Sequence, residues 1–323
     1  MNPSLRTLGA ALGAKHLVVV GGAVRDELLG RSHADWDLAT DLLPEAVMQR
    51  AKRAGLKVFP TGLQHGTVTV VVGAEPFEIT TFRSDGDYRD GRRPDSVKLG
   101  VTLEEDLARR DFTINAMALP LEGGEVTDPF GGRRDLEAGL IRAVGDPMQR
   151  FQEDGLRPLR ACRFAAQLGF AVEDATLAAI PQRLEVAKQV AVERVFQEMQ
   201  KLLAGAHARK GMQLLADCGL MDLWMPELRP MIGCGQNRHH RFPVWEHTLG
   251  VLALAPREAA QRWAALLHDV GKPPTRSQEK GEVHFYGHEA VSLQIAEAIL
   301  RRLKAPHELI HRVLALVRHH GVY

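Results

Sequence analysis

The fold is decided by residues 17–40, LVVVGGAVRDELLGRSHADWDLAT. Leu17–Val20 are apolar and predict a buried strand, and the turn Gly21-Gly22 that follows opens a helix. Because glycine carries no side chain, backbone N–H groups at this turn can approach phosphate oxygens, and Arg25 adds positive charge one turn further on. The stretch therefore predicts a phosphate cradle made of Gly21, Gly22 and Arg25.

Two carboxylates follow in the same stretch, at Asp35 and Asp37. Alternate side chains of a strand share a face, so we expect both aspartates to point the same way, with Trp36 packed behind them. Adjacent carboxylates repel unless a cation lies between them, and hard oxygen ligands suit Mg²⁺ that carries a triphosphate. A metal pair beside a phosphate cradle indicates nucleotidyl or phosphoryl transfer.

Length and composition limit the possible classes of protein. The 323 residues suffice for two or three domains, and 45% hydrophobic with 25% charged residues is ordinary for a globular protein. The net charge of +1 means that any nucleic-acid site is a local patch. The three cysteines are far apart, no signal peptide precedes Leu17, and the longest apolar runs are far short of a membrane span, so we expect a cytoplasmic protein without a membrane partner.

The predicted secondary structure changes in kind at Asp146-Pro147. Before it, short strands alternate with helices, and after it apolar residues recur at helical spacing, so the predicted fold class is α+β followed by all-α. The stretch Met231–Phe242, rich in Gly, His and Arg, marks a second boundary, which gives domains at 1–145, 146–230 and 231–323. The predicted elements of the first domain are strands at Leu17–Val20, Asp37–Ala39, Thr67–Val72, Phe77–Thr81 and Leu140–Val144, and a helix at Pro44–Ala54.

Two polar segments of the first domain have a functional and a structural interpretation. The segment Arg83–Pro94 is mixed in charge, and it is either a solvated loop or a lid over a phosphate-bearing ligand. Arg109 and Arg110 offer planar donors for phosphates, and Asp111 can accept from a ribose hydroxyl. The alternative for these three residues is a surface ion-pair cluster.

The segment Phe151–Arg160 offers a donor and an acceptor to a planar ligand. In a helix, Asp154 and Arg157 share a face at i and i+3, although Pro158 makes that helix irregular. Cytosine and adenine each present an amine beside a ring-nitrogen acceptor, whereas guanine and uracil present the reverse, so one Asp-Arg pair can select C and A. On these residues alone, a plain intrahelical salt bridge is the stronger interpretation.

Taken together, the order and spacing of these motifs resemble the class II tRNA nucleotidyltransferases, the CCA-adding enzymes of the DNA polymerase beta superfamily, which are similar to bacterial poly(A) polymerases. The resemblance covers Leu17 to Leu203 and implies a nucleotidyltransferase head with a mixed sheet, a helical neck that reads the incoming base, and a helical body. The motifs that carry it are Gly21-Gly22-Ala23-Val24-Arg25-Asp26, Asp35-Trp36-Asp37, Arg109-Arg110-Asp111, Glu153-Asp154-Gly155-Leu156-Arg157, and Glu193-Arg194 with Glu198.

The resemblance also implies partners and roles. The partners are tRNA, CTP and ATP, and the cofactor is Mg²⁺. The implied roles are metal binding by Asp35 and Asp37, triphosphate binding by Gly21, Gly22 and Arg25, ribose and nucleotide binding by Arg110 and Asp111, and base recognition by Asp154 and Arg157 with Arg160.

A second candidate site lies downstream, at His247, His268-Asp269 and His288, and His319-His320 follow near the end. This pattern resembles the HD phosphohydrolase superfamily, whose imidazole and carboxylate ligands suit Mn²⁺, Fe²⁺, Ni²⁺ or Mg²⁺. No cysteine lies among them, which argues against a structural zinc. The resemblance implies a further aspartate and a tail that holds the tRNA elbow. The chain ends at Tyr323, so we expect a truncated or naturally short chain with a reduced metal site.

The predicted function is a tRNA nucleotidyltransferase that adds C and/or A to the tRNA 3′ end by two-metal nucleotidyl transfer. Enzymes that add only A or only CC are the first alternatives, and a poly(A) polymerase is the next. A metal-dependent HD phosphohydrolase with an RNA-binding head comes last, because a head that only binds has no need of the pair Asp35 and Asp37. In the family that the sequence resembles, a shortened loop at this place accompanies addition of CC only, so the full-length segment Arg83–Pro94 implies that A addition is present.

Overall fold

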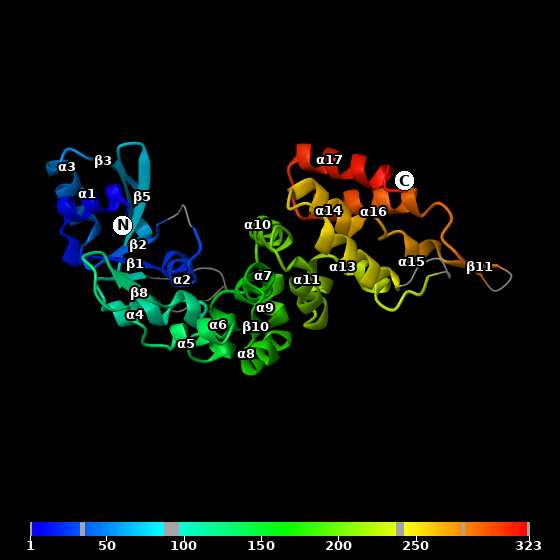
Figure 1. The fold of residues 1–323 in the computed structure, drawn as a ribbon, viewed down its shortest axis with the longest axis horizontal. Coiled ribbons are helices and arrows are strands. Elements are labelled where there is room, and N and C mark those ends of the chain that lie inside the picture. The colour runs from blue at the N-terminus through cyan, green and yellow to red at the C-terminus, as the bar shows by residue number, and fades with distance from the viewer. Residues whose placement is uncertain (1, 33–35, 87–96, 237–241, 280–281, 322–323) are drawn as a thin grey trace. The chain divides into compact units, whose positions relative to one another are not determined.

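A computed structural model of the chain describes residues 2–32, 36–86, 97–236, 242–279 and 282–321 (Figure 1). The chain divides into two compact units, Met1–Glu153 and Asp154–Tyr323. The predicted fold class is confirmed, because the first unit is built on a mixed sheet with helices and the second is helical apart from short strands. The predicted division of the helical part at residue 230 stays a prediction.

A six-stranded mixed sheet forms the centre of the first unit, in the order β3-β4-β5-β2-β1-β8. Strands β2 and β5 are parallel, and the other neighbours are antiparallel. The strands are β1 (Leu17–Val20), β2 (Leu38–Thr40), β3 (Lys57–Gly62), β4 (Thr67–Val72), β5 (Glu75–Thr81) and β8 (Ala118–Pro120). Strand β1 therefore has a partner along both edges, and all four of its residues are buried.

Most of the predicted elements of the first unit recur with small shifts. Strands β1 and β4 have the predicted bounds, because a continuous and an alternating apolar run identify them clearly. The strand predicted from Asp37 begins instead at Leu38, so Asp37 lies before β2. The strand predicted over 140–144 is only the short β9.

Helices and shorter elements complete the first unit around the sheet. A buried apolar cluster joins Val18 and Val20 of β1 to Phe82 and Leu107. The elements are α1 (Pro3–Leu12), η1 (Ala14–His16), α2 (Gly22–Leu28), α3 (Pro44–Arg53), η2 (Leu63–His65), β6 (Arg83–Asp85), β7 (Val97–Leu99), α4 (Leu103–Ala108), η3 (Thr113–Asn115), α5 (Gly132–Glu137), β9 (Leu140–Ile141) and α6 (Pro147–Glu153).

The second unit is a succession of packed helices, and its short strands β11 and β12 form a hairpin. Its elements are α7 (Arg157–Leu168), β10 (Ala171–Val172), α8 (Asp174–Ala179), η4 (Pro181–Arg183), α9 (Leu184–Lys188), α10 (Val192–Leu203), α11 (Ala208–Asp217), α12 (Leu220–Trp224), η5 (Pro226–Met231), α13 (Val244–Leu254), α14 (Ala259–Leu267), α15 (Lys272–Thr275), β11 (Ser277–Glu279), β12 (Glu282–His284), α16 (His288–Arg302) and α17 (His307–Arg318).

Helix α10 links the two ends of this unit. One face packs against α7, and another packs against α14 through Phe196, whose ring stacks on Trp263 at a centroid distance of 6.1 Å. The indole N–H of Trp263 donates to Gln200, which satisfies the polar atom of a fully buried side chain. Because α14 ends at Leu267, this contact fixes the position of His268 and Asp269 that follow.

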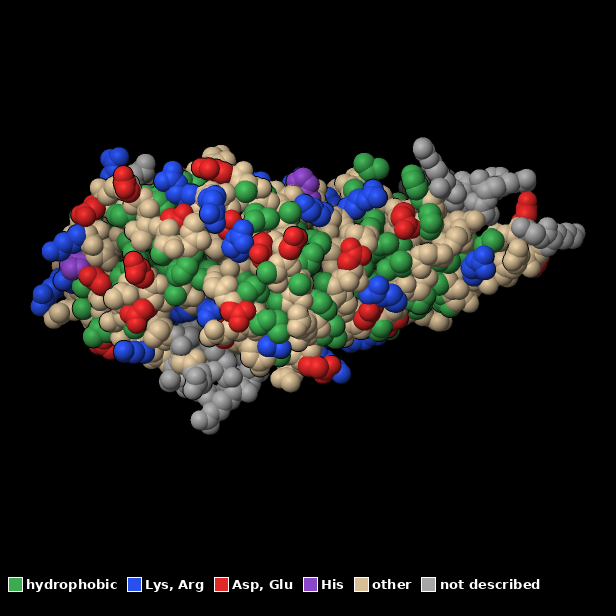
Figure 2. All heavy atoms as spheres, turned by 90° about the horizontal axis from the view of Figure 1, so that it is seen from below, with side chains coloured by type: hydrophobic (Ala, Val, Ile, Leu, Met, Phe, Trp, Pro, Cys, Tyr) green, Lys and Arg blue, Asp and Glu red, His purple; other side chains and the backbone are tan. Residues whose placement is uncertain are grey.

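The surface shows no segregation of charge on the face drawn in Figure 2, where basic and acidic side chains are interspersed. No helix in the described part of the chain combines the length and the apolar character needed to span a membrane.

Candidate active sites in the two units

In the first unit, the candidate site is built around the turn at Gly21. Gly21 has φ +68° and comes directly before α2. A Cβ at this position would lie 3.0 Å from a terminal nitrogen of Arg110 and 3.4 Å from Oδ2 of Asp37. Val20 N–H donates to the Asp37 carbonyl over 2.9 Å, so the strand edge holds Asp37 beside the turn. The structure thus brings Gly21, Asp37 and Arg110 together, and Asp35 lies outside the described residues.

Arg25 and Asp111 belong to one hydrogen-bond network. The Arg25 guanidinium is buried, binds the Asp26 carboxylate with two hydrogen bonds of 2.9 Å, and donates to Asn115 Oδ1 over 2.8 Å. Asn115 in turn donates to Asp111 Oδ1 over 3.1 Å. A Cβ at Gly22 would meet the Arg25 guanidinium at 3.4 Å. Arg25 therefore connects α2 to the Asp111 segment, and its predicted contact with a triphosphate stays a prediction.

The sequence analysis did not identify Asn115 as part of this site. It also missed Asp106, whose carboxylate orients Arg109 and Arg110. Asp106 is 1% exposed, and its two oxygens accept from Arg109 over 2.8 Å and from Arg110 over 3.2 Å. Burial raises the pKa of Asp106, but the charges of Arg109 and Arg110 outweigh burial, so this pKa lies below its usual value. The available signal was an acidic residue at i−3 and i−4 from two arginines.

In the second unit, the structure corrects the predicted placement of Asp154 and Arg157 on one helix. Helix α6 ends at Glu153 and α7 begins at Arg157, so the two residues are not on one helix. Asp154 Oδ1 accepts from Leu156 N–H over 3.0 Å, and Oδ2 accepts from Arg194 over 2.8 Å. Pro158 explains the interruption, because proline is tolerated in the first turn of a helix but not in its interior.

Close packing surrounds the predicted base-reading residues. A Cβ at Gly155 would lie 2.5 Å from the Val186 carbonyl oxygen, so only glycine fits between Asp154 and the segment behind it. Arg157 is buried. Arg160 is about a third exposed and lies 3.6 Å from the buried carboxylate of Glu198, which Arg163 also contacts at 2.8 Å.

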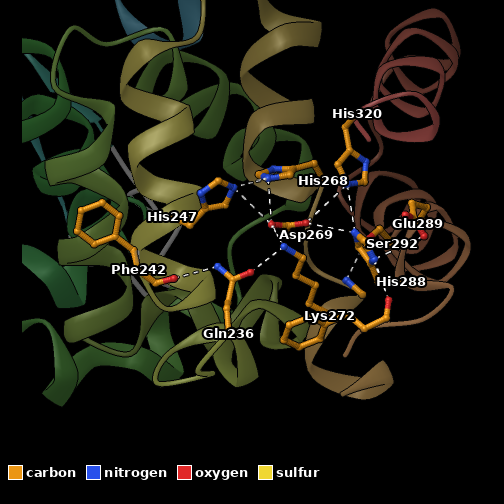
Figure 3. Close-up of polar contacts among 12 residues, drawn as sticks. Gln236, Phe242, His247, His268, Asp269, Lys272, His288, Glu289, Ser292 and His320 are labelled. Atoms are coloured by element: carbon orange, nitrogen blue, oxygen red, sulfur yellow. Dashed lines mark hydrogen bonds and ion pairs between the residues drawn. The ribbon is translucent and has the colours of Figure 1, made fainter. Parts of the chain in front are cut away.

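The second candidate site of this unit surrounds Asp269 and opens into a cavity of about 790 Å³ (Figure 3). His247 comes from α13 and His268 follows α14, and their Nε2 atoms lie 3.6 and 3.2 Å from Asp269 Oδ2. His288 begins α16 and His320 follows α17, and their Nε2 atoms lie 3.5 and 3.6 Å from Asp269 Oδ1. All four predicted ligands therefore meet, and His320 joins them.

Asp269 is a buried carboxylate whose surroundings lower its pKa. It is 1% exposed, and burial alone raises the pKa of an aspartate. Hydrogen bonds from His268, His288 and His320 outweigh burial and hold the pKa of Asp269 far below its usual range. The Lys272 ammonium also lies 2.8 Å from Asp269 Oδ2, and it donates to Gln236 over 2.8 Å.

Comparison with protein families identifies the three parts of the chain. The family described as "Poly A polymerase head domain" matches residues 17–142. "Probable RNA and SrmB- binding site of polymerase A" matches residues 169–232, and "HD domain" matches residues 244–322. The fold and the sites thus define a nucleotidyltransferase-type head followed by an HD-type helical part.

The individual relatives of the chain are CCA-adding enzymes. The CCA-adding enzyme of Geobacillus stearothermophilus is 45% identical over 260 residues, which are 80% of this chain and 60% of that enzyme. The CCA-adding enzyme of Bacillus velezensis is 39% identical over 300 residues, 92% of this chain and 66% of that enzyme. The crystal structure of the Bacillus stearothermophilus CCA-adding enzyme in complex with CTP matches with a TM-score of 0.73 at 33% identity, over 100% of this chain and 71% of that chain. The chain belongs to the family of CCA-adding enzymes.

The buried ion pairs of Asp106 predict a pH-dependent contribution to stability. Because its pKa is lowered in the folded state, this contribution is complete above the unfolded pKa of about 3.9 and is lost as the pH falls further. Asp106→Asn should lower the free energy of unfolding by about 1.5 to 3 kcal/mol at pH 7. Urea unfolding from pH 7 to pH 3 should show the difference from wild type shrink below about pH 4.

Glu122→Gln, a change at an exposed carboxylate of the same unit, is the matched control and should leave stability unchanged at every pH. A difference between wild type and Asp106→Asn that stays constant down to pH 3 would contradict the assignment of the lowered pKa to Asp106.

Proposed function

We propose that the protein is a tRNA nucleotidyltransferase that adds C and A to the 3′ end of tRNA from CTP and ATP, and that it works in the cytoplasm. One observation carries the proposal: the Asp37 carboxylate and the Arg110 guanidinium both approach the side-chain-free turn at Gly21. A metal-binding oxygen, a planar phosphate donor and an open backbone are the parts that nucleotidyl transfer requires.

The cofactor we propose for the head is Mg²⁺. Asp37 is exposed, and a solvent-facing carboxylate suits an ion that keeps several of its waters. Asp37 would hold it together with Asp35. When bound, Mg²⁺ lowers the pKa of the tRNA 3′-hydroxyl and neutralises the leaving pyrophosphate. Arg110, oriented by Asp106, binds the triphosphate, and Asp111, oriented by Asn115, accepts from the ribose hydroxyl.

For base selection we propose Asp154 and Arg157, with Arg160 beside them. Arg194 donates to Asp154 Oδ2 and fixes the direction of the carboxylate, so Asp154 can accept from the exocyclic amine shared by cytosine and adenine. The buried position of Arg157 restricts its rotamers, which favours one donor direction toward the ring nitrogen. Glu198 holds Arg160 in the same way.

An incorporation assay distinguishes which nucleotides the protein adds. A-only addition, CC-only addition and poly(A) synthesis use the same head. Most of the segment Arg83–Pro94, on which the expectation of A addition depends, lies outside the described residues. Incubation with tRNA that ends at the discriminator base, with each labelled triphosphate given separately and then together, distinguishes the four activities.

Removal of the Asp37 carboxylate tests the head. Asp37→Ala should lower nucleotide addition by about a thousandfold or more at saturating Mg²⁺, because a metal ligand in a transfer site is worth several kcal/mol. Single-turnover incorporation of labelled CMP and AMP measures this loss. Asp41→Ala, which changes the aspartate at the other end of β2, is the control and should retain activity. Addition by Asp37→Ala within tenfold of wild type would refute the assignment.

Replacement of Arg157 by lysine tests base selection. Arg157→Lys keeps the charge but loses the planar donor fork, so the preference for CTP over UTP should fall by about 1 to 3 kcal/mol, or roughly 5- to 150-fold. Arg301→Lys, at an exposed arginine of α16, should leave the preference unchanged. If kcat/KM falls equally for both triphosphates in Arg157→Lys, the residue supports the fold and does not read the base.

We also propose a phosphohydrolase activity at Asp269, because four imidazoles and one buried carboxylate converge at the wall of a cavity. Such a donor set fits Mn²⁺, Fe²⁺ or Ni²⁺ better than Mg²⁺. The rings of His284 and Tyr286 stack at the same cavity, 5.0 Å apart, and offer an aromatic surface for a nucleobase. The proposed substrates are phosphomonoesters and 2′,3′-cyclic phosphates.

Asp269→Asn should abolish hydrolysis of 2′,3′-cyclic AMP in the presence of Mn²⁺ while nucleotide addition continues, because Asp37 and Asp269 lie in separate compact units. Asp37→Ala is the reciprocal control, with hydrolysis retained and addition lost. Release of inorganic phosphate or of nucleoside monophosphate measures the reaction. Equal hydrolysis by Asp269→Asn and wild type would assign the activity to a contaminant.

A further inference from the structure

Two of the three cysteines meet inside the second unit, although they lie far apart in the sequence. Cys162 lies on α7 and is completely buried, and Cys218 directly follows α11 and is 6% exposed. The thiol of Cys162 donates a hydrogen bond to the sulfur of Cys218. Cys218 in turn donates its S–H to the Leu215 carbonyl over 3.7 Å. The two thiols therefore form a short hydrogen-bonded chain that ends on the backbone.

The packing of α7 against α11 holds the two sulfurs together. A Cβ at Gly211 of α11 would lie 2.6 Å from Cβ of Ala166 and 2.9 Å from the carbonyl oxygen of Cys162, so the two helices approach closely. The His207 N–H also donates to the Ala166 carbonyl over 2.7 Å. Gly211 and Cys218 are related as i and i+7, so both lie on the face of α11 that packs on α7.

The hydrogen bond between the thiols makes them chemically unequal. The hydrogen bond from Cys162 lowers the pKa of Cys218 and outweighs burial, which raises it. The pKa of Cys162 is raised, because its proton is held in that hydrogen bond and because its side chain is buried. The thiolate is the nucleophilic form of cysteine, so Cys218 is the sulfur that attacks an oxidant, with Cys162 in contact as the second thiol.

Burial limits which oxidant can react with the pair. Only a small part of Cys218 is exposed, which excludes a bulky disulfide such as oxidised glutathione but admits hydrogen peroxide. The third cysteine, Cys234, is less buried, yet burial raises its pKa, so it is the weaker nucleophile.

We infer that Cys162 and Cys218 are a redox-sensitive pair, which a peroxide converts to a disulfide and a dithiol reductant restores. The Cys218 thiolate attacks an oxygen of hydrogen peroxide, the O–O bond breaks, and Cys218 becomes a sulfenic acid. The hydroxide that leaves takes up the proton released by Cys218 and becomes water. The Cys162 sulfur then attacks the Cys218 sulfur, and the hydroxyl group leaves with the proton of Cys162 as a second water. The two thiols lose two electrons, which reduce the peroxide.

This disulfide would cross-link α7 to the end of α11 and enclose the segment that contains α8, α9 and α10. Helix α10 carries Arg194 and Glu198, the ion-pair partners of Asp154 and Arg160. A cross-link stabilises a protein mainly by restricting the unfolded chain, and more so when it encloses a long segment. Because α7 and α11 are already in contact, we expect oxidation to stabilise this unit against unfolding without displacing α7.

Thiol counting and intact mass test the inference. The full chain with Cys234→Ser, which leaves Cys162 and Cys218, is treated with equimolar hydrogen peroxide, quenched with catalase and denatured for titration of free thiols. Both thiols should disappear and the mass should fall by about 2 Da, the two hydrogen atoms lost, and dithiothreitol should reverse both changes. The midpoint of thermal unfolding of the oxidised chain should rise by about 5 °C or more.

The variant with both Cys162→Ala and Cys234→Ser is the matched control, because it keeps the attacking sulfur and removes the second thiol. Cys218 should then gain one oxygen, about 16 Da, and dimedone should trap the sulfenic acid. If this variant unfolds, as judged by circular dichroism, peptide mapping of the oxidised Cys234→Ser chain decides, because the peptides that contain Cys162 and Cys218 are either joined or separate.

Three results would overturn the inference. The first is that both thiols survive the peroxide, and the second is that the chain gains oxygen without the loss of about 2 Da. The third is a disulfide that joins two chains, seen as a dimer on a non-reducing gel. If the internal bond forms but the unfolding midpoint does not rise, the stabilising cross-link is overturned. Oxidation by glutathione disulfide as fast as by peroxide would overturn the assignment of peroxide as the oxidant.

Discussion

The pairing of β1 along both of its edges is the constraint on which the head site depends. Strands β2 and β8 hydrogen-bond to β1, and the strand is buried on both faces, so its C-terminal end has one position. That end leads into Gly21, where a side chain would occupy the space between Asp37 and Arg110. A shift in the register of β1 would move the turn and the carboxylate apart together, because Val20 and Asp37 are hydrogen-bonded across the same edge.

The two candidate metal sites use opposite chemistry. In the head, the carboxylate of Asp37 is exposed and the neighbouring cation is an arginine that a buried Asp106 holds in place. Around Asp269, a single buried carboxylate is surrounded by imidazoles, each from a different helix or from the segment that follows one. Oxygen ligands open to water suit Mg²⁺, whereas a nitrogen-rich site suits a transition metal, so one chain can hold both without exchange.

The hydrophobic periodicity of the sequence predicted the strands of the sheet. It did not predict contacts between residues far apart in the sequence. The alternation in β4 and the apolar run of β1 gave their bounds, because burial sets both patterns. Asp154 and Arg157 were expected on one helix, yet the partner of Asp154 is Arg194, forty residues away on α10. Such a partner depends on how α7 and α10 pack, which local spacing does not encode.

The histidine cluster also contains a remote contact that the sequence did not predict. The ligands His247, His268, Asp269 and His288 were chosen by motif, and the structure brings them together. His320 was visible in the sequence but had no assigned role, because its approach to Asp269 follows from the packing of α17 against α14 and α16. Asn115 and Asp106 were missed because they contact other side chains of the head site and are not part of a recognised motif.

Helix α10 bears on how such proteins exchange parts in evolution. Its residues contact Asp154 at one end and, through Phe196, the ring of Trp263 beside the histidine cluster. Phe196 is 4% exposed and Trp263 is completely buried, so both belong to one apolar core. A recombination event that joined this neck to a foreign C-terminal part would uncover both rings unless the incoming helix carried a matching aromatic face. The packing of Phe196 on Trp263 therefore couples the position of α10 to that of the helix that precedes the histidine cluster.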